Sequence, residues 1–292
     1  MQDITNENTT CNLTNNITIE KICNAIDTIN CSNSVIYCYT GTGNSFAASK
    51  QFSKFFDGIE IKFITQELVD NPETVKKDFG IIVVPSYAYG VPKLVKRWLK
   101  KARFYIDYLA VAVLQGSSQR GTGAEVAKLL KRQKQQVAYS SGVDSMENYV
   151  HLFGHPKPEK AEKRAKDQHN SVARLCEIYK NREVKKIKTF RPLSAFVSFI
   201  FRTAKVFFPL RYRTTKTCNG CEICRKVCPP DAIVMREKKG RKIPKFKALR
   251  CDHCQACMQL CPSKSIKFFR IKPKSPRYKH KDCALKELIK RD

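Results

Sequence analysis

Residues 218–229 read Cys218-Asn-Gly-Cys-Glu-Ile-Cys-Arg-Lys-Val-Cys-Pro229, and residues 251–262 read Cys251-Asp-His-Cys-Gln-Ala-Cys-Met-Gln-Leu-Cys-Pro262. Both stretches follow the pattern Cys-x2-Cys-x2-Cys-x3-Cys-Pro, so the chain carries an internal repeat. Three cysteines at this spacing form a tight loop that wraps three corners of an iron–sulfur cube. The fourth, followed by a helix-stopping proline, points away and caps the cube of the other repeat. The duplication therefore predicts two [4Fe–4S] clusters whose ligand sets cross between the repeats.

The crossing assigns four cysteines to each cluster. Cluster I is expected to take Cys218, Cys221, Cys224 and Cys261, and cluster II is expected to take Cys251, Cys254, Cys257 and Cys228. The alternative is zinc, but zinc ribbons use paired Cys-x2-Cys knuckles and have no use for a third cysteine or a trailing Cys-Pro. Residues 214 to 270 resemble bacterial-type two-cluster ferredoxins, which are small α+β domains.

The stretch between the repeats, residues 235–250, is strongly basic. We expect it to form a solvated hairpin whose positive charge raises the reduction potential of a neighbouring cluster. His253 lies inside the second cysteine loop, and we expect it to be an exposed loop residue because the cysteines already fill the cube.

The N-terminal half alternates between β-rich and helical patterns. Strands are expected at 34–39, 60–64, 79–84, 109–114 and 136–140, and helices at 46–56, 91–101, 121–134 and 156–181, with Pro92 in a first helical turn. This alternation predicts an α/β domain with a doubly wound parallel sheet covered by helices on both faces.

A glycine-rich turn follows the first expected strand and precedes the first expected helix. It consists of Thr40, Gly41, Thr42, Gly43, Asn44 and Ser45. Glycines let backbone N–H groups turn inward, hydroxyls add donors, and the helix N-terminus supplies positive potential, so the turn fits a phosphate group. It is neither a P-loop nor a Rossmann fingerprint, because Gly-Lys-Ser/Thr and Gly-x-Gly-x-x-Gly are both absent.

The turn resembles the first loop of flavodoxins, which follows Thr/Ser-x-Thr-Gly-Asn-Thr/Ser and holds the phosphate of FMN. The resemblance implies two further flavin loops after later strands. They would supply Ser86, Tyr87, Tyr89 and Gly90 from one loop and Gly116, Ser117 and Ser118 from the other. Tyr87 or Tyr89 could stack on the flavin ring, although an aromatic pair in a loop is often ordinary packing.

Residues 34 to 282 together resemble the flavodoxin–ferredoxin fusion proteins of anaerobes, including a late Arg277-Tyr278-Lys279-His280 stretch. We divide the chain into a partly disordered extension (1–32), a flavodoxin-like domain (33–182), a linker helix (183–213), a ferredoxin domain (214–272) and a tail (273–292). The linker is rich in phenylalanine, and we expect it to pack between the two domains.

The composition bounds the environment and the partners. The formal net charge is +29, and residues 211–292 hold 24 Lys/Arg against 7 Asp/Glu. Such a charge fits a redox partner protein that is acidic at its docking face. We expect no nucleic-acid partner. Peripheral membrane contact is possible, but no specific feature supports it. No apolar stretch is long enough to span a bilayer. No secretory signal begins the chain, so we expect a cytoplasmic protein whose 14 cysteines serve metal rather than disulfides.

The features together favour an electron-transfer iron–sulfur flavoprotein with two [4Fe–4S] clusters and an expected FMN. Two alternatives stay open. The chain could be an oxidoreductase that reduces a quinone or another small acceptor at the flavin, or a ferredoxin-type carrier with an empty flavodoxin-like docking domain. The sequence shows no Cys–His or Ser–His–Asp arrangement typical of a hydrolase, and it does not decide whether the protein is an enzyme.

Overall fold

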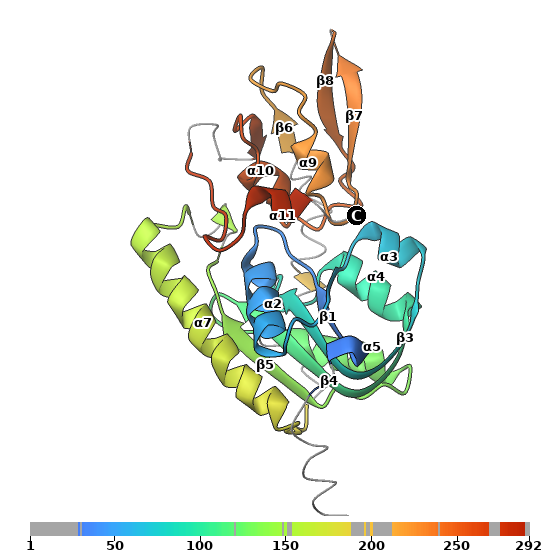
Figure 1. The fold of residues 1–292 in the computed structure, drawn as a ribbon. Helices are drawn as coiled ribbons and strands as arrows, with labels where there is room; N and C mark the ends of the chain where they lie inside the picture. Colours follow the sequence, from blue (N-terminus) through green and yellow to red (C-terminus); the bar gives the residue numbers. More distant parts are fainter. Residues whose placement is uncertain are drawn as a thin grey trace, which may run out of the picture.

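The computed structural model describes residues 29, 31–119, 121–147, 149–150, 154–187, 196, 199–200, 212–238, 240–268 and 275–289. An α/β part built on a parallel sheet comes first. A small α+β module then packs at the carboxyl ends of the strands of that sheet (Figure 1). The expected extension before residue 29 and most of the expected linker helix lie outside the described residues.

The sheet has five strands. They are β1 (Ser34–Cys38), β2 (Ile61–Phe63), β3 (Thr74–Pro85), β4 (Arg103–Gln115) and β5 (Tyr139–Asp144). All neighbours pair in parallel, and the order is β2-β1-β3-β4-β5. This is the order of flavodoxin-like doubly wound sheets. It confirms the predicted fold class.

The central strands β3 and β4 are longer than predicted. The prediction rested on their continuous apolar second halves, whereas their first halves alternate between exposed and buried residues. In β4, Phe104 and Ile106 are buried while Tyr105 and Asp107 are exposed. Strand β5 starts three residues later than predicted. The side chain of Gln135 accepts from the Ile106 N–H at 2.9 Å and donates to the Ile106 carbonyl at 2.8 Å. This amide replaces a strand neighbour there, so pairing with β4 begins only at Tyr139.

Helices cover both faces of the sheet. Helices α2 (Asn44–Phe55) and α7 (Pro158–Lys180) pack on one face, where Phe52, Phe79 and Val172 share a buried core. Helices α4 (Lys93–Lys101) and α5 (Thr122–Lys131) cover the other face through residues such as Trp98 and Val126. Pro92 is the N-cap of α4 rather than part of its first turn. The sequence patterns did not predict the short α3 (Gln66–Asp70) or the 3-10 turn η1 (Cys31–Asn33).

The C-terminal module holds two small antiparallel sheets. Strand β6 (Tyr212–Thr214) pairs with β9 (Ile266–Phe268), and β7 (Ile233–Lys238) pairs with β8 (Arg241–Phe246) as the expected hairpin. Short helices α9 (Ile223–Lys226) and α10 (Ala256–Gln259) each carry the third cysteine of a motif, and α11 (Leu285–Ile289) follows near the end of the chain.

The internal repeat is visible in the backbone. Glu222 and Gln255, which occupy equivalent places in the two motifs, have φ angles of 61° and 62°. Asp231 and Lys264 are equivalent as well, with φ angles of 45° and 48°. Positive φ is uncommon for residues other than glycine, so its recurrence at matched positions shows that the two cysteine loops share one conformation.

The module and the sheet share one core. Val227, Ala256, Leu260 and Leu288 are buried in the same cluster as the side chains under α4. The expectation that the linker phenylalanines pack between the domains is wrong for the two that are described, since Phe196 and Phe199 are 61% and 63% exposed. Among the described residues, no helix combines the length and the apolar character needed to cross a bilayer.

Candidate functional site: two cysteine-lined cavities beside a larger pocket

Cys218, Cys221, Cys224 and Cys261 line one small cavity of the C-terminal module. The first three come from the loop before and within α9, and Cys261 comes from the second motif, after α10. Met235 of β7 and Pro244 of β8 complete the wall. The structure therefore brings together the set predicted for cluster I, including its one member from the other repeat.

Cys228, Cys251, Cys254 and Cys257 line a second small cavity, together with Tyr212, Ile233 and Phe246. This is the set predicted for cluster II, and Cys228 is again the member that crosses from the other repeat. Ligation of iron by these eight thiols stays a prediction, but each predicted set surrounds its own cavity.

Burial and mutual proximity dominate the electrostatics of these thiols. Burial raises the pKa of Cys224 to about 12, and the nearby Cys261, Cys218 and Cys221 add to that rise. Burial also holds the pKa of Cys257 well above its usual value, with contributions from Cys228, Cys251 and Cys254. Positive iron can offset the charge of thiolates crowded in this way, so metal binding and deprotonation are coupled here.

Cys261 behaves differently. Burial raises the pKa of its thiol, but hydrogen bonds from Ser263, Ser265 and backbone N–H groups outweigh burial, and the net pKa is lowered. Those same groups would donate to the sulfur of a metal-bound thiolate, which is the kind of contact that tunes a cluster potential.

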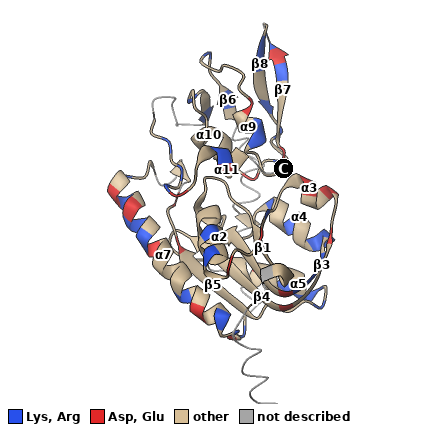
Figure 2. Ribbon diagram, in the orientation of Figure 1, with Lys and Arg blue, Asp and Glu red and all other residues tan. Residues whose placement is uncertain are grey.

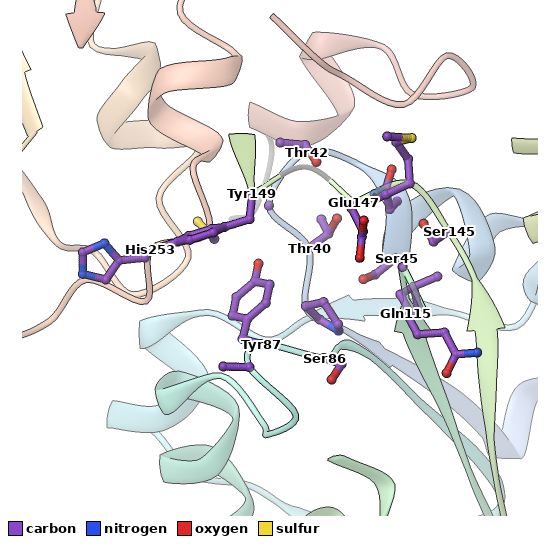
Figure 3. Close-up of a pocket in the computed structure, with 18 of the residues that line it drawn as sticks. Thr40, Thr42, Ser45, Ser86, Tyr87, Gln115, Ser145, Glu147, Tyr149 and His253 are labelled. Atoms are coloured by element: carbon purple, nitrogen blue, oxygen red, sulfur yellow. The ribbon is translucent and has the colours of Figure 1, made fainter. Parts of the chain in front are cut away.

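A third, larger cavity of about 260 Å³ lies where the sheet meets the module (Figure 3). Loops after β1, β3, β4 and β5 line it from the sheet, and residues 252–254 line it from the second cysteine motif. These loops follow the carboxyl ends of parallel strands, which is where open α/β sheets bind their ligands.

Nearly all the residues predicted to bind a flavin line this cavity. They are Thr40, Gly41, Thr42, Asn44, Ser45, Ser86, Tyr87, Tyr89, Gly116, Ser117 and Ser118. Two predicted residues do not line it. Gly43 is the N-cap of α2 with a φ of 102°, and Gly90 closes a tight turn by backbone hydrogen bonds with Tyr87. Both support the loops rather than form the wall.

One end of the cavity is polar. Figure 3 shows the hydroxyl-bearing side chains of Thr40, Thr42 and Ser45 around this end. Asn44 and Ser45 open helix α2, where the first N–H groups have no carbonyl partner within the helix. Thr40 Oγ1 accepts from the Gly43 N–H at 3.2 Å, which fixes the turn. The arrangement suits an anionic group.

Aromatic rings line the other end. Tyr87 and Tyr149 both lie at the cavity in Figure 3, and burial raises the pKa of Tyr149 to about 12, so its hydroxyl stays protonated. Ala88 and Tyr89 adopt positive φ angles of 50° and 61°, so this loop is held in an uncommon conformation.

The sequence reasoning missed Tyr149 and Glu147, which line the same cavity from the segment after β5. Glu147 lies against Gly116, where a Cβ would come within 1.8 Å of the Glu147 Cγ. No glycine-rich or aromatic signature marks this segment. A systematic search of the residues after each predicted strand could have found it.

The second cysteine motif forms part of the cavity wall. A Cβ on Gly41 would lie 2.6 Å from the Cys254 carbonyl oxygen, so only glycine lets the first loop approach the motif this closely. His253 is also buried, at 8% exposure, beside the rings of Tyr212 and Phe268. The expectation of an exposed His253 is wrong because its ring packs against those of Tyr212 in β6 and Phe268 in β9, within the module itself.

Asp252 ties the motif to helix α4. Its carboxylate accepts from the N–H groups of Lys93 and Leu94, each at 3.1 Å, and from the Tyr39 hydroxyl at 3.0 Å. The α4 N-cap, Pro92, offers no side-chain acceptor, so Asp252 caps this helix from the other domain. Burial raises the pKa of Asp252, while these hydrogen bonds lower it.

The segment 275–289 packs against the back of the first loop. Tyr278 donates to Asn44 Oδ1 at 2.7 Å, the His280 N–H donates to the Thr42 carbonyl at 2.9 Å, and Lys50 of α2 pairs with Glu287 at 2.9 Å. We call this segment the C-terminal strap. It includes the Arg-Tyr-x-His stretch noted in the sequence.

Residues 217–265 match the 4Fe-4S dicluster domain family. The C-terminal module is therefore an iron–sulfur domain with a role in electron transfer, as its cysteine spacing predicts. No curated protein matches the chain at a significant level.

Proposed function

We propose that the chain is an electron-transfer iron–sulfur flavoprotein. In this proposal FMN binds in the large cavity and exchanges electrons with cluster II, while cluster I lies further along the same route. The observation that carries the proposal is that one cavity is lined both by the three loops expected to hold a flavin and by Cys254 of the second cysteine motif.

The cavity fits FMN in the distribution of its chemistry. Hydroxyls and the N-terminus of α2 suit the phosphate, and the rings of Tyr87 and Tyr149 suit a flat aromatic system. The cavity belongs to the β1/β3 switch point, which is where sheets of this strand order bind FMN. Two carboxylates oppose an anion in this cavity, Glu147 and Asp252. Figure 3 shows Glu147 beside Thr40 and Ser45, so a phosphate at this end requires the Glu147 side chain to move.

A bound flavin would supply exchange of one or two electrons, and the clusters would supply one-electron steps. The protein's own part is to hold these groups close together and to keep water out. The close approach of Gly41 to Cys254 supports this, because the flavin loop and the motif of cluster II meet with no side chain between them.

The first test is the FMN content per chain after anaerobic purification and cluster reconstitution. About one FMN per chain supports the proposal. No flavin after incubation with excess FMN would contradict it and would favour an iron–sulfur carrier whose N-terminal domain serves only for docking.

The variant Ser45→Asp tests the phosphate site. A carboxylate in the first turn of α2 favours the helix but repels a phosphate, so we expect the folded variant to lose FMN affinity. Because Ser45 is 1% exposed, the added charge also lowers stability, and thermal unfolding checks that the variant is folded. Loss of one charge-assisted contact corresponds to a roughly ten- to hundredfold weaker Kd. Fluorescence titration with FMN and with riboflavin measures this effect.

Riboflavin is the internal control, because it lacks the phosphate and should bind the variant and the parent chain alike. An equal loss of both ligands in Ser45→Asp would show that the polar end does not bind the phosphate. Steady-state assays with small quinones, run on the parent chain, separate an electron carrier from an oxidoreductase that turns over at the flavin.

A further inference from the structure

The two cysteine-lined cavities differ in their relation to the large cavity in which FMN is proposed to bind, which we call the flavin cavity. The cavity predicted for cluster II shares Asp252 and Cys254 with it, whereas the cavity predicted for cluster I shares none of its lining residues. Electron transfer slows steeply with distance, so cluster II is placed to serve the cavity and cluster I is placed to serve something else.

Exposure separates the two sites in the same direction. Cys221, in the set for cluster I, is exposed, and it is the only exposed thiol among the eight cysteines of the two motifs. Two thiols in the set for cluster II, Cys254 and Cys257, are each 9% exposed, whereas the set for cluster I has one buried thiol, Cys224, at 8%. The surface near Cys221 is therefore the shortest way between the clusters and a molecule outside the protein.

Positive side chains surround that surface. The β7–β8 hairpin packs on the loop that carries Cys221, since a Cβ on Gly220 would lie 3.1 Å from the Lys242 carbonyl oxygen, and Arg241 donates to the Lys216 carbonyl at 2.8 Å. We define the basic face as the exposed residues Lys216, Arg225, Arg236, Lys238, Arg241 and Lys242. Its hairpin members lie on both sides of the hairpin, with Arg236, Lys238 and Arg241 on one side and Lys242 on the other, beside Met235 and Pro244 of the cluster I cavity. Figure 2 shows blue segments on both strands of the hairpin and on α9.

The acidic residues near this face do not cancel its charge. Glu222 contacts Arg225 at 3.1 Å and Lys242 at 4.0 Å, so one carboxylate is shared between two cations. Glu237 is the only acidic residue of the hairpin strands. The hairpin forms its own two-stranded sheet and stands away from the larger sheet (Figure 1), and its outer residues are free to meet a partner.

We propose that an acidic one-electron carrier protein docks on the basic face and exchanges electrons with cluster I at the Cys221 edge. The proposal extends the proposed function by assigning cluster I to the partner and cluster II to the flavin. It rests on that function only for the identity of the clusters. In each exchange one electron leaves the reduced protein and enters the oxidised one, and no bond or proton changes hands.

The composition of the face favours a protein over a nucleic acid or a membrane. Single-stranded nucleic acids need exposed aromatic platforms, but the only aromatic ring of the two hairpin strands, Phe246, is half-buried and packs on Tyr212 with ring centroids 5.4 Å apart. Surface binding to membranes needs apolar anchors, and the exposed positions of the two hairpin strands are all charged. Leu249, 88% exposed after β8, is the single exposed large apolar side chain in the described part of the C-terminal module. Charge alone gives fast, salt-dependent encounters, which suit a carrier that must also leave.

The test uses the full reconstituted chain with oxidised rubredoxin, a small acidic one-iron protein that bleaches when it is reduced. The clusters are first reduced and freed of reductant, and stopped-flow absorbance then gives the second-order rate constant. The variant Arg236→Glu/Lys238→Glu reverses two charges at exposed positions of β7. Position 238 pairs with Arg241 in the ladder, so a carboxylate there favours the hairpin.

We expect the rate constant to fall by about 10- to 100-fold at low salt and the difference to shrink as salt rises. The matched control is Lys128→Glu/Lys131→Glu, which makes the same charge change on exposed positions of α5. Lys242→Glu is a second basic-face variant that should act in the same direction. Iron content should stay at the parent value. The rate with a small uncharged acceptor, which reports any change in cluster potential, should change far less than the rate with rubredoxin.

Equal rate constants in the basic-face and α5 variants would overturn the proposal. A second result would also overturn it. That result is that duplex DNA or anionic vesicles bind more tightly than rubredoxin at matched salt, and that the hairpin variant abolishes this DNA or vesicle binding. The assay needs only the clusters. A chain that binds no FMN but keeps the salt-dependent rate would therefore refute the proposed FMN binding and would still support docking on the basic face.

Discussion

At the scale of single residues, Cys228 and Cys261 matter most, because each lies in one repeat and lines the cavity of the other. Cys228 faces Cys251, Cys254 and Cys257, and Cys261 faces Cys218, Cys221 and Cys224. The proline after each of them ends the local turn and lets the cysteine reach across. The module therefore folds as one unit, and neither repeat can build a complete site alone.

The crossing predicts which pairs of substitutions act on one cluster. Cys221→Ser and Cys261→Ser should each lower the iron content from about eight to about four per chain, and the double variant should lose no more. Cys221→Ser with Cys228→Ser should lose both clusters. Iron analysis with electron paramagnetic resonance after reduction measures the outcome, and a further loss in the Cys221/Cys261 pair would refute the assignment.

At the scale of elements, the C-terminal strap holds the first loop from behind. Its contacts reach the loop through Asn44 and Thr42, and a Cβ on Gly43 would lie 3.2 Å from both His280 and Cys283. Burial lowers the pKa of His280, so its imidazole stays neutral at neutral pH despite the nearby Asp282. The strap therefore acts as a packed support for the turn.

Tyr278→Phe removes the hydrogen bond from the strap to Asn44 and keeps the ring. We expect a loss of about 1 kcal/mol in the free energy of unfolding. Because Asn44 belongs to the glycine-rich turn proposed to hold the FMN phosphate, we also expect a roughly three- to tenfold weaker FMN Kd. Thermal unfolding and flavin titration measure the two effects.

Tyr105→Phe is the matched control for that variant, since Tyr105 is 60% exposed on β4. It should change neither quantity. If Tyr278→Phe lowers stability and leaves FMN affinity unchanged, the strap supports the fold but does not shape the loop.

At the scale of the whole molecule, the two domains share a cavity wall. Cys254 and Asp252 line the large cavity, and Asp252 caps α4 from the other domain. An iron-free module would lose the bonds that hold its cysteine loops, and that wall would loosen. Cluster assembly and flavin binding should therefore be coupled.

We predict that the cluster-free chain binds FMN about tenfold or more weakly than the reconstituted chain, measured by anaerobic fluorescence titration. Cys221→Ser is the control, because it should remove cluster I, whose cavity shares no residue with the flavin cavity, and should leave FMN affinity nearly unchanged. Equal affinities of the cluster-free and reconstituted chains would show that the two domains bind their cofactors independently.

Local patterns were enough to predict much of the fold. Strand and helix periods predicted the parallel sheet, and the glycine-rich turn was expected at the cavity, where it lies. Strand ends were harder to predict, because the side chain of Gln135 replaces a β4 partner and delays β5. Tyr149 and Glu147 carry no local motif, so only their position after a predicted strand could have pointed to them.

By itself the sequence determined the iron–sulfur module and predicted its two sets of cysteines, because a four-iron cube dictates the spacing of its ligands within a few residues. Only the tertiary structure decided that Cys254 lines the large cavity, that Asp252 caps α4, and that the basic hairpin stands beside Cys221. These contacts join residues far apart in the chain. They depend on how two separately patterned domains pack, and no local period records that packing.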